Sequence, residues 1–164
     1  EKMEPFIGDE ILDTYHAVEW CIEHGLIQQA YTMLQENVIT TVCLLLEEED
    51  ANIYKRIAVS KGVVVACRDT PEKEWRFKAP EEKLLMQRTV QALQPYSELF
   101  GHFSTLWEWR NNMNHAEKNS QAPIRPERFF QKIVEITKAL EPFFLEASAT
   151  LNSSKEGAQS TEER

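Results

Sequence analysis

Glycine, cysteine and long apolar runs are all scarce in this sequence. Its 164 residues include five glycines, whereas barrels with many tight turns and dinucleotide-binding folds with a glycine-rich loop need more. No apolar run is long enough to span a membrane, and no basic-then-apolar signal peptide opens the chain. The three cysteines, Cys21, Cys43 and Cys67, form no CxxC pair, which disfavours a zinc knuckle or a disulfide framework. We therefore expect one reduced, cytoplasmic domain.

Charge is distributed unevenly along the chain. The formal net charge is −9, which argues against a protein that coats DNA broadly. Residues 1–50 hold twelve acids and one lysine (net −11), residues 51–132 hold nine acids and fourteen bases (net +5), and residues 133–164 have a net charge of −3. The mildly basic centre fits either solvated helix faces or a local anion site inside an acidic protein.

The apolar residues recur at helical spacing through most of the chain. Residues 51–67 could be helix or strand, because Val63, Val64 and Val65 are β-branched, and we favour helix since no partner strand is visible. Ser97 is expected to cap a helix, and Pro142 to kink or break the last one. The expected helices cover residues 9–24, 26–49, 51–67, 80–93, 97–115 and 126 onward.

This pattern predicts an all-α protein, an antiparallel bundle of five to six helices. The helical domain is expected to cover residues 1–151. Residues 152–164 contain no large apolar side chain and are expected to be a disordered tail. Because helical bundles have no default function, the function must be argued from a site.

The segment whose composition most strongly indicates a functional site is Arg110-Asn111-Asn112-Met113-Asn114-His115. Asparagine is a poor helix former, so helix propensity does not explain this composition. An arginine offers a planar donor fork for phosphate, and a histidine can move a proton near neutral pH. Together they supply what metal-free phosphodiester cleavage requires, a base or acid and a cation beside the developing negative charge. The alternative is an exposed polar helix end.

Helix geometry disfavours a catalytic pair formed by Arg110 and His115 of the same chain. Five residues at about 100° each place Arg110 and His115 about 140° apart on an ideal helix, so the two side chains would not meet. Either the helix is distorted there, or a second protomer completes the site across a two-fold axis.

Other candidates are weaker. The spacing of His16 and His24 on the first helix does not make a credible metal set, so we predict no metal site. Cys21 and Cys43 have no evident basic neighbour and are expected to be buried, inert thiols. Trp107 and Trp109 are two residues apart and cannot both face the core, so one of them is free to stack on a base or fill a dimer interface.

The segment from Arg110 to His115 resembles the Arg-x4-6-His signature of HEPN domains, including the polar residue that follows the arginine. A second stretch, Trp-Cys-Ile-Glu-His-Gly-Leu-Ile-Gln-Gln-Ala-Tyr-Thr-Met-Leu-Gln-Glu at residues 20–36, resembles the opening helix pair of the HEPN domain in CRISPR-associated proteins of the DxTHG-motif type. Taken together, the two stretches extend the resemblance over roughly residues 9–145.

The resemblance implies a metal-independent, single-strand endoribonuclease of type III CRISPR antiviral defence that acts as a homodimer and needs no cofactor. Arg110 would stabilise the phosphate, His115 would act as general acid or base, and Asn111 would orient one of them. Asn114 and Trp109 are weaker candidates for substrate contacts. Such proteins carry an N-terminal CARF domain that senses cyclic oligoadenylate, so this chain is expected to be the effector half.

Three alternatives stay open. One is a HEPN module without nuclease activity that serves dimerisation or RNA binding. Another is the HEPN toxin of a toxin–antitoxin pair. The third is a helical adaptor in which the Arg-x4-His spacing arises by chance. All three keep the all-helical fold, and they differ from the first interpretation in activity or in partner.

Overall fold

The fold is described by a computed structural model, which covers residues 7–114 and 125–162. Every regular element in this part of the chain is helical, so the predicted all-α class is confirmed. No helix within it is long and apolar enough to cross a membrane. The elements are α1 Glu10–Glu23, α2 Ile27–Leu45, α3 Ile53–Cys67, η1 Glu72–Glu74, α4 Pro80–Leu93, η2 Gln94–Leu99, α5 Phe100–Asn114 and α6 Pro126–Glu162, where η denotes a short 3₁₀ segment.

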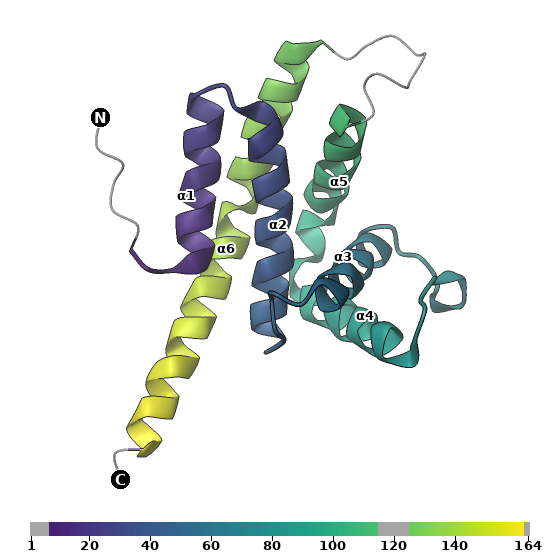
Figure 1. Ribbon diagram of the computed structural model, residues 1–164, viewed down its shortest axis with the longest axis vertical. Helices are drawn as coiled ribbons and strands as arrows, with labels where there is room; N and C mark the ends of the chain where they lie inside the picture. Colours follow the sequence, from purple (N-terminus) through teal and green to yellow (C-terminus); the bar gives the residue numbers. More distant parts are fainter. Residues whose placement is uncertain (1–6, 115–124, 163–164) are drawn as a thin grey trace.

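Helix α2 lies at the centre of the bundle (Figure 1). It contacts α1 and α6 on one side and α3 and α5 on the other. Helices α3 and α4 pack closely against each other beside α2 and α5, away from α1. Every residue from Asn37 to Cys43 on α2 is buried, which fits a helix enclosed on all sides.

Local capping chemistry explains most of the helix starts. The Asp9 carboxylate accepts hydrogen bonds from the backbone N–H groups of Ile11 (3.0 Å) and Leu12 (3.1 Å) and so begins α1. Asn52 caps α3 in the same way, so residues 53–67 are helical, which is the alternative that the sequence analysis favoured. Pro80 stands in the first turn of α4, where its missing N–H costs nothing.

Two expected helix limits were wrong. Helix α2 ends at Leu45 instead of Glu49, because Glu47 adopts a left-handed conformation (φ 55°) and leaves the helix. Glu48 then turns to form ion pairs with Lys55 at 2.7 Å and with Arg88. Ser97 caps nothing, since η2 joins α4 to α5 without an N-cap residue of the ordinary kind.

Helix α6 is longer than the sequence suggested. It continues through Pro142 without a break, and Lys138, whose carbonyl loses its helical partner there, is an exposed residue that water can reach. It also runs to Glu162, where a disordered tail was expected from residue 152. Extending an existing helix costs far less than nucleating one, and the tail holds good helix formers such as Lys155 and Glu156. Its residues 152–157 are exposed and lie beyond the bundle.

Gly62 marks the closest approach of α3 and α4. A Cβ atom at this position would lie 2.6 Å from the Cβ and 2.7 Å from the Cγ2 of Thr89. Thr89 is buried and cannot move aside easily, since its hydroxyl donates to the carbonyl of Leu85 at 2.9 Å. Only glycine therefore fits between the two helices at this level.

We predict that Gly62→Ala lowers the free energy of unfolding by about 1–3 kcal/mol through overpacking. Gly101→Ala is the matched control, because nothing lies within 4 Å of the added methyl group and Gly101 is helical. That variant should be neutral or slightly more stable. Urea denaturation of both variants measures the difference, and equal stabilities would contradict the close contact.

Candidate functional site

Arg110 lies on the buried face of α5, one turn from its end. Phe103, Leu106 and Trp107 are the buried residues of this helix. At about 100° per residue, Arg110 falls in the middle of the stripe that these three side chains define. The residue is half-buried, and its Nε atom is buried without a hydrogen-bond partner. An arginine in such a position is normally paired, because an unpaired buried polar group costs free energy.

All other half-buried cations of the described chain are paired with a carboxylate. Arg56, for example, has its Nη2 atom 2.6 Å from Glu36. Arg110 is the exception, because its side chain forms no ion pair or hydrogen bond with any residue that the structure describes. Its charge is therefore not neutralised by any acid within the described part of the chain. The paired half-buried cations are Lys55, Arg56, Lys61, Lys83, Arg88 and Lys132.

Aromatic contacts fix the end of α5 that carries Arg110. The Trp109 ring meets the Phe129 ring of α6 edge to face, with centroids 5.2 Å apart. The buried Tyr31 of α2 donates its hydroxyl to the Phe129 carbonyl at 2.9 Å. Lys132 lies 5.8 Å from the centre of the Trp109 ring. Helix α6, itself bonded to α2, therefore holds this end of α5 in place.

The two tryptophans pack against different helices, so the expectation that one of the rings is free was wrong. Trp107 is 7% exposed, and its indole N–H donates to the Ser60 hydroxyl of α3 at 3.3 Å. Trp109 packs toward α6 and is half-buried. This packing gives Trp109 a role in positioning α5, and its contact with substrate stays a prediction.

Two asparagines near Arg110 lie at the surface of the protein. Asn111 and Asn114 are both exposed. Asn114 is the last residue of α5 and lies one turn after Arg110, on the same side of the helix. His115 lies outside the described residues. The structure therefore places the arginine and two asparagines of the predicted site and leaves the role of the histidine as a prediction.

The remaining candidates form no second site. His16 is exposed and lies 2.9 Å from Glu19, and His24 stacks on Trp20 at its helix end. Across residues 7–114 and 125–162, no three His, Cys, Asp or Glu side chains form a metal-sized group. Burial raises the pKa of Cys21 and Cys43, and raises that of Cys67 to about 12. These thiols are protonated at neutral pH and so are poor nucleophiles.

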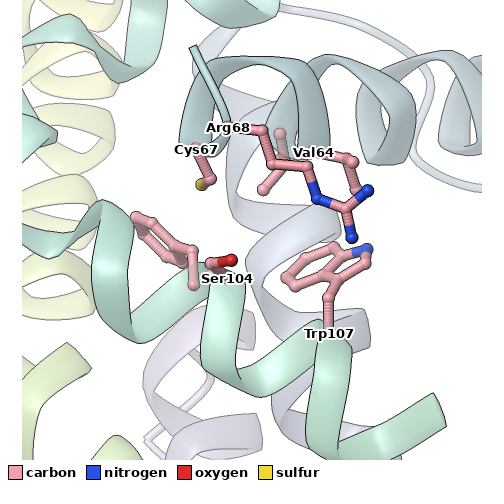
Figure 2. A pocket seen from close by; sticks show the side chains of 7 residues that line it. Val64, Cys67, Arg68, Ser104 and Trp107 are labelled. Atoms are coloured by element: carbon pink, nitrogen blue, oxygen red, sulfur yellow. The ribbon is translucent and has the colours of Figure 1, made fainter. Parts of the chain in front are cut away.

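A small hollow between α3 and α5 lies one turn before Arg110 (Figure 2). It is lined in part by Arg68 at the end of α3 and by Ser104 and Trp107 of α5. The sequence analysis missed Arg68 and Ser104. They are far apart in the sequence and belong to no shared motif, so only the packing of α3 on α5 brings them together.

Comparison of the chain with protein-family models, with curated proteins and with solved structures gave no match.

We predict that Arg110→Met leaves the free energy of unfolding unchanged or raises it by up to about 2 kcal/mol, because the substitution removes an unpaired, partly desolvated cation. Arg56→Met is the matched control and should lose about 1–3 kcal/mol, since Arg56 donates to Thr40 at 3.0 Å and to the Asp50 carbonyl at 2.8 Å besides pairing with Glu36. Urea denaturation compares the two. Equal losses would mean that Arg110 is a structural residue.

Proposed function

We propose that this chain is a HEPN-type endoribonuclease that cleaves single-stranded RNA as a homodimer, without a metal ion. The observation that carries the proposal is Arg110, the half-buried cation that the described chain leaves unpaired. A cation that faces the protein interior at a helix end, without a carboxylate, is suited to an anionic ligand. The resemblance of residues 20–36 and 110–115 to HEPN domains indicates RNA as this ligand.

The reaction requires proton transfer and charge stabilisation. A base removes the proton of a ribose 2′-hydroxyl, whose oxygen forms a bond to the adjacent phosphorus. The bond from phosphorus to the 5′-oxygen breaks, and an acid protonates that leaving oxygen. The products are a 2′,3′-cyclic phosphate and a 5′-hydroxyl end. His115 is the proposed acid or base, and Arg110 stabilises the charge on the pentavalent phosphorus group.

A second copy of the chain completes the proposed site. Helix α5 is described as far as Asn114, and a helix continued by one residue would turn His115 about 140° away from Arg110. The side of α5 that carries Arg110 also carries exposed Asn114. Two-fold pairing of two such helix ends would bring the polar groups of both copies around one phosphate.

The proposed setting is type III CRISPR antiviral defence. There a CARF domain that binds cyclic oligoadenylate would control this helical domain. The acidic net charge of −9 disfavours tight nonspecific RNA binding. RNA would thus be held mainly at the composite site, where the unpaired Arg110 lies.

We predict that the chain cleaves a labelled single-stranded RNA in the presence of EDTA. Arg110→Ala and His115→Ala should each reduce the rate constant by about 10²-fold or more, because general acid–base catalysis and charge stabilisation each contribute at that scale. His102→Ala is the control, since His102 is on the same helix about 12 Å before Arg110 along its axis. Gel electrophoresis of the products, with a test for the cyclic phosphate end, measures the reaction.

Thermal melting of all three variants shows whether each is folded. Equal cleavage by native protein and His115→Ala would contradict the proposed catalytic role. RNA binding without cleavage by the native homodimer would favour a HEPN module without nuclease activity. Metal-dependent cleavage that survives both substitutions would place the activity elsewhere in the chain.

A further inference from the structure

The hollow between α3 and α5 is lined mainly by apolar side chains, to which Arg68 and Ser104 add two polar groups. Its space of about 10 Å³ accommodates a single water-sized group, such as one phosphate oxygen. Arg68 extends from the end of α3 toward the Trp107 ring, and Ser104 of α5 lies beside them (Figure 2). Both helices that form it are fixed by the core through Val63 and Phe103.

The polar groups at the hollow have unused hydrogen-bonding capacity. The Arg68 side chain is exposed and forms no ion pair or hydrogen bond with the residues that the structure covers. The Ser104 hydroxyl likewise has no partner among them. No carboxylate lines the hollow, and Asp69, the acid next to Arg68 in the chain, does not reach it. The Cys67 thiol stays neutral because burial raises its pKa to about 12.

The hollow is also close to Arg110. Trp107, which forms one wall, precedes Arg110 by three residues, about 4.5 Å along the helix axis, and Ser104 precedes it by about 9 Å. Neighbouring phosphates of one RNA strand could therefore contact the hollow and Arg110 at the same time. Arg68 also has the planar donor fork that recognises phosphate oxygens.

We propose that Arg68 and Ser104 form a second phosphate contact, which holds the RNA strand beside the phosphate that Arg110 binds. This inference rests on the proposed function and extends it, because it assigns a binding role to residues outside the Arg-x4-His segment. Arg68 is a substrate-binding residue in this proposal and takes no part in bond cleavage. Trp107 is the wall that holds the Arg68 side chain over the hollow.

The test is RNA binding by the His115→Ala protein, measured by fluorescence anisotropy of a labelled single strand at several salt concentrations. Adding Arg68→Ala should weaken binding about fivefold at low salt and reduce the slope of log K against log salt by about 0.7, the value for one lost phosphate contact on a single strand. Arg68→Lys should keep the salt slope, because it keeps the charge. Ser104→Ala should weaken binding without changing the slope.

Lys155→Ala is the control, because Lys155 is an exposed cation on the part of α6 that extends beyond the bundle. If Arg68→Ala and Lys155→Ala have the same small effect on affinity and slope, the second contact is disproved. A protein that cleaves RNA normally with Arg68→Ala, with unchanged KM, would also disprove it and leave the proposed function standing. Weaker binding by Arg68→Ala in a protein whose His115→Ala variant still cleaves would support the contact and contradict the proposed catalytic pair.

Discussion

The structure depends on the burial of α2 on every side. From Asn37 to Cys43 this helix has no exposed residue, so its neighbours must cover it completely. Two of its polar residues form hydrogen bonds within that cover: Asn37 donates to the Ile11 carbonyl of α1 at 3.0 Å, and Thr40 accepts from Arg56 of α3 at 3.0 Å. The buried Thr41 hydroxyl has no hydrogen-bond partner among the described residues. Because α1, α3, α5 and α6 all pack on α2, the ends of these helices are fixed relative to one another. The position of Arg110 follows from this enclosure.

Ion pairs within the protein neutralise its other half-buried cations and leave only Arg110 without an acid partner among the described residues. The basic middle of the sequence had suggested an anion site, yet most of its half-buried cations neutralise acids of the protein itself. Glu48 alone binds both Lys55 and Arg88, and these contacts hold its pKa below the ordinary value for a glutamate. Arg110 has no such acid among the described residues, although the chain is rich in them. In an acidic protein, a cation kept free of carboxylates is a specific feature of the local packing, and net charge alone does not reveal it.

Much of the fold could be predicted from the sequence, because apolar residues recur at helical spacing along most of the chain. The helices expected from residues 9 and 80 are α1 and α4, which begin at Glu10 and Pro80, whereas the predicted cap at Ser97 was wrong. The end of α2 could not be predicted, since Glu48 leaves the helix for partners on α3 and α4 that are close only in the folded chain. The helical state of residues 152–162 was missed for a related reason, because composition alone does not report that α6 already provides a nucleus. At the site, Arg110 was predicted from its motif, whereas its burial and lack of a partner required the structure.

The core-facing position of Arg110 limits how a site around it can be built. Leu106 and Trp107 hold the preceding turn of α5 in the core, and Trp109 holds the helix end against α6. This end of α5 therefore cannot rotate to present Arg110 to a different side of its own chain without losing those contacts. A residue one position beyond α5 on a continued helix would face away from Arg110. In the proposed function, a histidine on such a continued helix would therefore act with the guanidinium of a second copy and not with that of its own chain. A two-fold dimer meets the requirement without disturbing the core, and it would give both copies the same environment.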